Sequence, residues 1–307
     1  NIFGKDVAGV SKQTTDFAGL YNFAFSLPVG NLLIGNAKVP QGAGFASFTV
    51  AADGSYTLAG RTADQEKLTG KAWVGPDGQC FVFQTLYSTK IKGSVLGTFD
   101  IQKGPTSQEN DIFGALDWVR PANPKSRLYK DGFGLSGTPV TSPVPLDVYG
   151  GRYLVPPASG TLFDTDPLVP GPVDILADLS FSEDGTLDGS MAGGGDVDTL
   201  TNPNVAGITV QAGSKLVIPA STAETKLTPV HKTGALSGGF KLLDGGLKRS
   251  VSFQGLVIRK RVSAEGALPR ITDVIGVGYF IIDQKPVGLE KPTSTPQQSG
   301  IFNFQDN

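Results

Sequence analysis

The chain is poor in the residues that most often carry chemistry. Its 307 residues include one cysteine, Cys80, one histidine, His231, and one methionine. A single cysteine excludes an internal disulfide, and the apolar context QCFVFQTLY predicts a small buried side chain. Zinc sites and Ser-His-Asp relays would both depend on His231, whose surroundings, LTPVHKTG, predict a surface loop instead. We therefore predict that the protein is not an enzyme and holds no cofactor.

An excess of charge and long apolar runs are also missing. The 26 Lys and Arg residues nearly balance the 28 Asp and Glu residues. A nucleic-acid partner, which requires a basic surface, is therefore not expected. No segment approaches the ~18 uninterrupted apolar residues of a membrane-spanning helix. With 41 Gly and 21 Pro residues, the composition is typical of a soluble, turn-rich protein that does not span a membrane.

Short strands bounded by turns fill most of the chain. Residues 44–62 alternate apolar and polar side chains on both sides of an Asp-Gly pair, which is the pattern of a β-hairpin. The same device recurs around the Asp-Gly pairs at 77–78, 184–185 and 244–245. Such runs number about eight in each half, enough to close a barrel filled by side chains. We predict an all-β protein of two tandem antiparallel β-barrel-like domains, each of about eight strands.

The strand pattern occurs twice in the sequence, once in each half. The segments that share it are KGSVLGTFDIQK (92–103) and DIFGALDWVRP (111–121) in the first half, and TGALSGGFKLLDGG (233–246), VSFQGLVIRKR (251–261) and IGVGYFIID (275–283) in the second. A Pro-, Gly- and Ser-rich stretch separates the copies, and a second one precedes the last residues. These features predict one barrel at 1–144, a second at 145–290, and a linker with an apolar tail at 291–307.

This spacing resembles a known but uncharacterised repeat. Gly-x-[Phe/Leu]-x-Gly-x-Phe at 234–240, then Phe-x-Gly-x-Val at 253–257 and Gly-x-Gly-Tyr-Phe at 276–280, is similar to a β-rich repeat domain of large secreted or cell-surface bacterial proteins. The similarity extends over most of the chain, in two copies. It implies an extracellular or cell-surface location. It brings no catalytic residue, because its motifs consist of packing and turn residues.

Alternation along two strands assigns the two tryptophans to different environments. In DIFGALDWV, Trp118 shares a side with Ile112 and Leu116, which predicts a core residue. In KLTGKAWV, Trp73 lies with Thr69 and Lys71 on the polar side of the strand. An exposed tryptophan is a common contact for a sugar ring or a protein partner, so Trp73 is a candidate binding residue. The alternative is a tryptophan that covers a barrel mouth or packs against the other domain.

Charge is segregated in the second half. Residues 161–200 contain nine acidic residues and no Lys or Arg, and Asp196 and Asp198 in GGGDVD are candidate calcium ligands. The alternative is a solvated acidic loop. Between 238 and 261 the chain is basic, and Arg259, Lys260 and Arg261 are candidate partner-binding residues. They would meet the acidic loops of a neighbouring subunit, or else protect an exposed strand edge from aggregation.

The last residues, IFNFQDN, predict a short apolar strand on a tether. Phe302 and Phe304 fall on one side of it. We expect this strand to add to a sheet edge of another copy, which would build a homo-oligomer or filament. The alternative is that the tail folds back and closes an edge of its own domain.

Three function classes are compatible with these features. We expect a secreted or cell-surface structural and assembly module that binds itself or another cell-surface protein. The first alternative is a carbohydrate-binding or adhesive module that holds a glycan at Trp73. The second is an outer-membrane barrel, which the frequent prolines and the lack of evident lipid-facing girdles disfavour.

Overall fold

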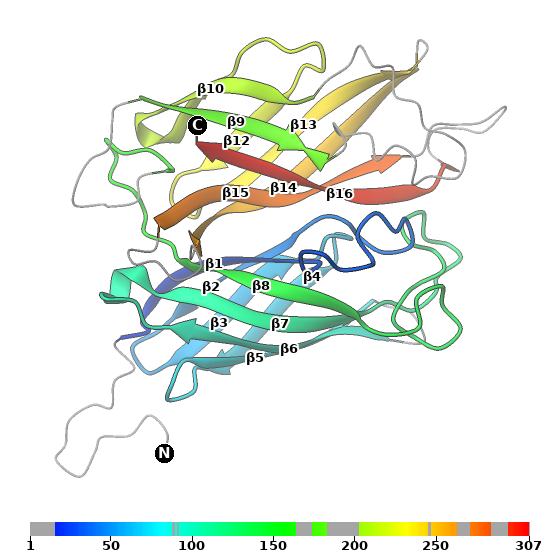
Figure 1. Cartoon of the computed structure of the whole chain (residues 1–307), viewed down its shortest axis with the longest axis horizontal. Helices are drawn as coiled ribbons and strands as arrows, with labels where there is room; N and C mark the ends of the chain where they lie inside the picture. Colours follow the sequence, from blue (N-terminus) through cyan, green and yellow to red (C-terminus); the bar gives the residue numbers. More distant parts are fainter. Residues whose placement is uncertain are drawn as a thin grey trace.

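The computed structural model describes residues 16–87, 90, 92–163, 174–182, 203–244, 247–262, 271–283 and 294–306. More than half of these residues lie in strands, and short 3-10 turns occur at Ser107–Glu109 (η1) and Ala212–Ser214 (η3). The strands form two eight-stranded antiparallel sheets, one from each half, which curl into two stacked barrels (Figure 1). The predicted all-β fold with two tandem barrel-like domains is confirmed.

The first barrel is an up-and-down meander in which the first and last strands pair with each other. Neighbours in sequence pair from β1 to β4 and from β5 to β8, and β1 pairs with β8, so the sheet ends at β4 and β5. Its strands are β1 (Gly19–Ser26), β2 (Gly44–Val50), β3 (Ser55–Arg61), β4 (Lys67–Trp73), β5 (Gln79–Leu86), β6 (Gly93–Gln102), β7 (Asp111–Val119) and β8 (Val144–Arg152).

The second barrel repeats this plan with its break one strand earlier. Here β9 pairs with β16, and the sheet ends at β11 and β12. Its strands are β9 (Asp174–Phe181), β10 (Val205–Gln211), β11 (Lys215–Val217), β12 (Lys226–Val230), β13 (Ala235–Asp244), β14 (Leu247–Val262), β15 (Ile271–Asp283) and β16 (Gln297–Asp306). Counted from the break, β6 and β13 hold the same place, as do β7 and β14, which matches the repeated sequence segments.

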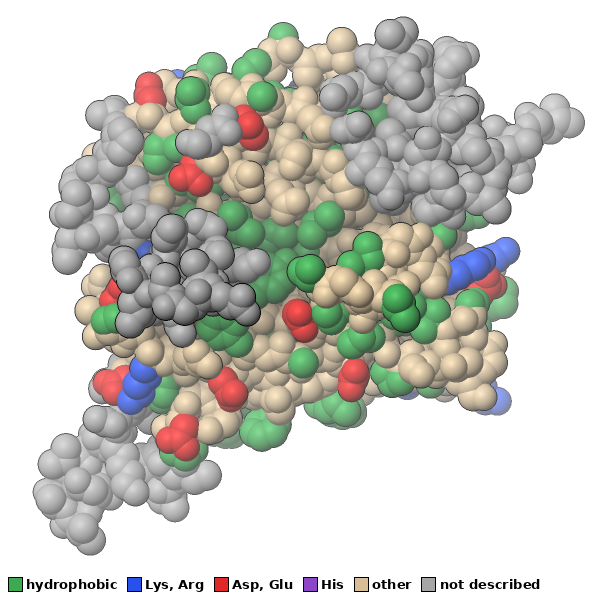
Figure 2. Space-filling view, viewed as in Figure 1, with side chains coloured by type: hydrophobic (Ala, Val, Ile, Leu, Met, Phe, Trp, Pro, Cys, Tyr) green, Lys and Arg blue, Asp and Glu red, His purple; other side chains and the backbone are tan. Residues whose placement is uncertain are grey.

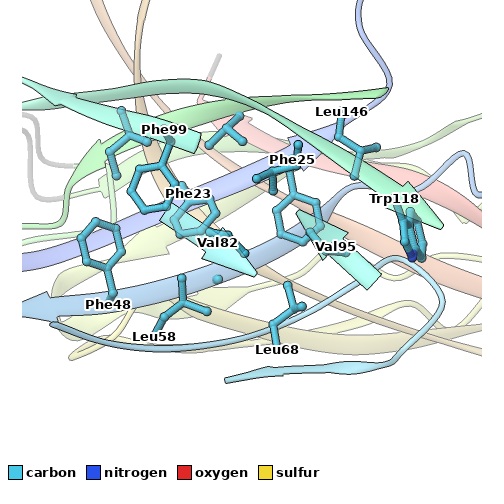
Figure 3. Packing of buried hydrophobic residues seen from close by; sticks show 14 of the residues in the cluster. Phe23, Phe25, Phe48, Leu58, Leu68, Val82, Val95, Phe99, Trp118 and Leu146 are labelled. Atoms are coloured by element: carbon cyan, nitrogen blue, oxygen red, sulfur yellow. The ribbon is translucent and has the colours of Figure 1, made fainter. Parts of the chain in front are cut away.

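Aromatic side chains fill the interior of the first barrel. Phe23 lies at the centre, with ring centroids 5.1 Å from Phe99 and 5.9 Å from Phe48. Figure 3 shows these rings converging from several strands, together with aliphatic side chains from the facing strands. Trp118 is buried on β7 and packs edge-on against Phe133, so its predicted core position is confirmed. The interior is therefore a packed core.

One end of the first barrel is closed by the long connection between β7 and β8. Arg120 in this connection is buried and forms an ion pair with the equally buried Asp64. The same carboxylate accepts a 2.7 Å hydrogen bond from the Tyr87 hydroxyl, and that hydroxyl accepts one of 2.9 Å from the Trp118 indole. A buried charge is tolerated only when it is paired and hydrogen-bonded, as it is here.

The second barrel has its own aromatic core, and the C-terminal tail is part of it. Phe181 contacts Phe240, Phe253 and Phe302, with ring centroids 4.6–6.2 Å apart. Phe302 and Phe304 lie on β16, which inserts between β15 and β9 of its own sheet, and both side chains are fully buried. The expectation that this tail joins a neighbouring subunit is therefore wrong. The alternative, in which it closes its own barrel, describes the fold.

The predicted domain boundaries also need correction. Residues 144–152 form β8, which pairs with β1 and β7 and contributes Val144, Leu146 and Val148 to the first core. The first barrel therefore extends to residue 152 rather than 144. Residues 297–306 belong to the second barrel rather than to a separate tail. In both cases the strand is assigned by a pairing distant in sequence, which local composition does not report.

The two barrels share a packed interface between β1, β2 and β8 of the first and β14 and β15 of the second (Figure 1). A separate apolar cluster fills it, formed by Ala24 and Ala43 from the first barrel and Leu256, Ile258 and Val277 from the second. The ring of Phe45 also stacks on that of Tyr279 at 5.9 Å. The barrels therefore form one continuous body.

A buried asparagine links the two barrels. The Asn22 amide nitrogen on β1 donates 2.9 Å hydrogen bonds to the carbonyl oxygens of both Thr233 and Val257 in the second barrel. Gly234 lies against this contact with φ of 70°, and a β-carbon there would lie 2.8 Å from the Tyr153 ring. Both donor hydrogens of one amide are thus used to satisfy buried backbone oxygens.

Replacing Asn22 with aspartate should destabilise the protein strongly. The Asn22→Asp side chain has nearly the same shape, but its carboxylate would face two carbonyl oxygens and leave them unpaired. We expect a loss of about 3–5 kcal/mol in the free energy of unfolding at neutral pH. Chemical denaturation measures it. The control is Thr49→Asp, which adds the same charge at an exposed position of β2. Equal stability of the two variants would contradict the role of Asn22.

Truncating Phe304 should show that β16 is integral to the second barrel. Phe304→Ala removes a fully buried ring and should lower the free energy of unfolding by about 3–5 kcal/mol. Gln305→Ala, at the neighbouring exposed position, should change it by less than about 0.5 kcal/mol. Thermal unfolding followed by circular dichroism separates the two results. A neutral Phe304→Ala would place this strand outside the folded core.

Candidate functional site

The most distinctive surface of the first barrel is the seam where its sheet ends. Strand β4 pairs only with β3, and β5 pairs only with β6, so no ladder of backbone hydrogen bonds joins β4 to β5. Side chains bridge the seam instead. The Tyr56 hydroxyl donates to the Phe81 carbonyl oxygen at 2.8 Å, and the Gln84 side-chain oxygen accepts from the Thr69 backbone nitrogen at 3.4 Å. These longer links hold the two strands apart.

The separation leaves an open groove of about 220 Å³ between the strands. This is roughly seven times the ~30 Å³ that a water molecule occupies in the liquid, so the groove can admit a side chain. The residues that line it come from β3, β4 and β5, and they are Tyr56, Leu58, Leu68, Thr69, Gly70, Lys71, Ala72, Phe81, Val82, Phe83 and Gln84. The lining is therefore mainly apolar.

Two exposed aromatic rings line this groove, and a third lies at the end of β4. Phe81 and Phe83 on β5 are 67% and 71% exposed, and Trp73 at the end of β4 is 62% exposed. The alternation of β5 explains the two phenylalanines, because Cys80 and Val82 point into the barrel and their neighbours must point out. Leu96, directly across from Phe83 on β6, is also exposed and extends the apolar surface. Apolar side chains gathered in this way mark interaction surfaces.

The electrostatics of the groove are simple. Among its described lining residues, Lys71 is the one charged side chain and no carboxylate is present. Burial, with a smaller contribution from Cys80, raises the pKa of Tyr56 well above its usual value. The Tyr56 hydroxyl therefore stays protonated and keeps donating across the seam. A neutral or acidic partner with apolar side chains fits this environment.

Gly70 leaves part of the groove unfilled. It occupies an inward position of β4, and a β-carbon built on it would have no neighbour within 4 Å. Leu68 and Ala72, the neighbouring inward positions, are buried and half-buried. A larger residue at 70 would thus enter open space rather than collide with the barrel. This makes Gly70 the position from which the groove can be filled by substitution.

The predicted binding residues fall in different places. Trp73 is exposed beside the groove, as its alternation predicted. Phe302 and Phe304 are core residues, so their predicted binding role is wrong. Arg259 lies on β14, and its guanidinium donates toward the Gln108 carbonyl oxygen of the first barrel at 3.4 Å. β13 pairs with β14 only as far as Leu256, so at Arg259 the strand pairs with β15 alone.

The structure locates two of the four remaining charged candidates. Lys260 and Arg261 continue β14 opposite Asp273 and Thr272. The acidic candidates Asp196 and Asp198 lie outside the described residues. Within the described part of the chain, no group of three or more His, Cys, Asp or Glu side chains is arranged to hold a metal ion.

His231, just after β12, is hydrogen-bonded to the segments that precede β9 and β11. Its Nε2 lies 2.9 Å from the Pro156 carbonyl oxygen, which can only accept, so Nε2 carries the proton. Nδ1 then accepts a 2.6 Å hydrogen bond from the Ser214 hydroxyl, and Ser214 is buried. Ser214 precedes β11 and His231 follows β12, so this contact crosses the seam of the second barrel. The half-buried His231 is thus more than a surface-loop residue, and its hydrogen bonds serve the fold.

Sequence reasoning missed Phe81 and Phe83. The signal was present, because a buried Cys80 requires the residues on either side of it to face the opposite way.

No protein-family model, curated protein or solved structure matches this chain. Among the described residues, no helix is long and apolar enough to cross a membrane.

Cys80 offers a direct test of how tightly the seam is held. Burial, with a smaller effect of Asp100, raises the pKa of the Cys80 thiol to about 12. We expect no reaction with Ellman's reagent in the folded protein at pH 8, and full reaction in guanidinium. Since the folded pKa exceeds the unfolded value of 9.0, stability should fall as pH rises from there toward about 12. Cys80→Ala, which has no thiol, gives the background signal of the reagent. Rapid labelling of folded protein would show that β5 opens readily.

Proposed function

We propose that the protein is a non-enzymatic assembly module, acting outside the cell or at its surface, that holds an apolar segment of a partner in the groove between β4 and β5. The observation that carries the proposal is the groove itself, with Phe81, Phe83 and Trp73 exposed around it. The extracellular setting is supported by the resemblance of the repeat to secreted and cell-surface domains. The scarcity of histidine and cysteine supports binding rather than catalysis.

The groove has the features of a binding hot spot. Leu58, Leu68 and Val82 form an apolar floor, and the phenylalanine rings stand at its rim. Aromatic side chains dominate the energy of many protein interfaces because each buries a large area at little entropic cost. The two strands that border the groove, β4 and β5, are also held in place by the packed core of the barrel. The site therefore needs little ordering when a side chain enters.

The two strands beside the groove favour an extended partner. β4 and β5 are the end strands of the sheet, so each has a side that no neighbouring strand occupies. Main-chain hydrogen bonds to such an edge can hold a peptide in register, while its alternate side chains enter a pocket. We therefore favour a peptide segment with aliphatic side chains as the bound group.

Filling the groove by substitution should weaken peptide binding. A displayed library of random peptides panned against the protein should yield sequences that carry Leu, Ile or Val. Gly70→Leu should weaken their binding by at least about tenfold, since loss of one apolar anchor is worth roughly 1.5–3 kcal/mol. Thr57→Leu, which adds an apolar side chain at an exposed position of β3 that does not line the groove, is the control. Equal binding to both variants would contradict the proposal.

Exposed Trp73 supports a second candidate, the binding of a glycan. Trp73, Lys71 and Thr69 share the outer face of β4, where a sugar ring could stack on the indole while polar groups contact its hydroxyls. A glycan array probed with the intact protein and with Trp73→Ala tests this function. Binding lost in Trp73→Ala but kept in Gly70→Leu would favour a glycan over a peptide.

A further inference from the structure

The connection between β1 and β2 exposes three aliphatic side chains. Val29 is 101% exposed, Leu32 is 97% exposed and Ile34 is 54% exposed. In Figure 2, apolar side chains stand at the surface where Figure 1 places this blue loop. Residues 26–37 include no charged side chain. We call residues 27–41 the aliphatic loop. Its tip is an uncharged apolar projection, and Lys38, the one charged residue of the loop, lies beyond the tip and pairs with Asp131 at 3.7 Å.

The aliphatic loop is held in one conformation by Gln41. The Gln41 side-chain nitrogen donates to the carbonyl oxygens of Leu33, Asn36 and Val39 at 3.0–3.1 Å. Its oxygen accepts from the Gly35 backbone nitrogen at 2.8 Å. The Leu33 side chain packs against the first core and anchors the loop. Because the loop is ordered in advance, a partner that buries its tip does not have to offset the entropy of fixing it.

The loop cannot reach the groove of its own chain. It lies beside the second barrel, where the Gln298 side chain donates to the Ala37 carbonyl oxygen and the Gln41 backbone nitrogen donates to that of Ser299, both at 3.3 Å. The groove lies between β4, which is three strands from β1, and β5, which is three strands from β8. That position is on the opposite wall, which faces away from the second barrel. A projection and a hollow are therefore on separate surfaces of one chain.

We infer that the partner held in the groove is the aliphatic loop of a second copy of this chain. The inference rests on the proposed function of the groove and names its occupant. The tip of the loop is exposed, aliphatic and uncharged, and the groove is concave and lined mainly by apolar side chains. Inserting the tip would bury apolar surface on both sides, and Lys71, the one charged side chain of the groove lining, can keep its ammonium group in water. Each copy would keep one free loop and one free groove.

Such a contact joins two different surfaces, so it does not close by two-fold symmetry. Repeating it builds a head-to-tail chain of molecules rather than a dimer. The contact is a small one, so assembly should be reversible and depend on concentration. This outcome agrees with the homo-oligomer or filament expected from the sequence, but it uses the aliphatic loop instead of the C-terminal strand.

Sedimentation of complementary variants tests the inference. Intact protein should exceed the monomer mass of 32.0 kDa progressively over roughly 1 µM to 1 mM, the range of weak, small interfaces. Leu32→Ser removes the projection and Gly70→Leu fills the hollow, and each variant alone should weaken self-association at least tenfold. An equimolar mixture should stop at a dimer, because it offers one intact loop and one intact groove. Thr57→Leu, at an exposed position outside the groove, should assemble like the intact chain.

The outcomes separate this inference from the proposed function. If intact protein stays monomeric at 1 mM while selected peptides still bind the groove, the second copy is not the partner but the function stands. If the chain assembles and neither variant alters it, the aliphatic loop is not in the contact. Binding of intact protein to phosphatidylcholine vesicles, lost in Leu32→Ser, would assign the loop to a membrane surface and overturn the inference. If peptides bind Gly70→Leu unchanged, the proposed function itself fails.

Discussion

The pairing of β1 with β8, and of β9 with β16, is the constraint on which both barrels depend. Every other pairing joins strands that follow each other in sequence, so without this contact each half would separate into two smaller meanders. In both barrels the break falls at a connection within the half instead of between its first and last strands. At the first break the Gly75 backbone nitrogen donates to the Gln79 carbonyl oxygen at 2.7 Å. The seam strands thus stay tethered at one end and separate along their length.

The two seams are bridged by different side chains. In the second barrel, Ser214 and His231 meet directly at 2.6 Å across the break. In the first barrel, Tyr56 reaches across from β3 behind β4, and Gln84 extends a full side chain to the backbone of β4. Links of this length cannot bring two backbones to the ~4.8 Å spacing of paired strands. The groove is the space that remains.

Local pattern predicted the strands, the two-barrel architecture and the environments of both tryptophans, because alternation within a strand requires no knowledge of its partner. The same alternation placed Phe302 and Phe304 on one side of a short strand. It could not tell which sheet that strand would join, since the pairing of β16 with β9 spans more than a hundred residues. Asn22 was missed for a related reason. Its value comes from two carbonyl oxygens of the other barrel.

The interface between the barrels explains why the groove and the aliphatic loop face different directions. The second barrel packs on the wall formed by β1, β2 and β8. The hydrogen bonds of Asn22 to Thr233 and Val257 hold β1, one strand of the closing β1–β8 pair, against the second barrel. That wall is the one opposite the seam, so the most constrained and the least constrained parts of the first barrel lie as far apart as an eight-stranded sheet allows. A segment can therefore enter the seam without disturbing the contact between barrels. The loop beside that contact remains rigid and available to another molecule.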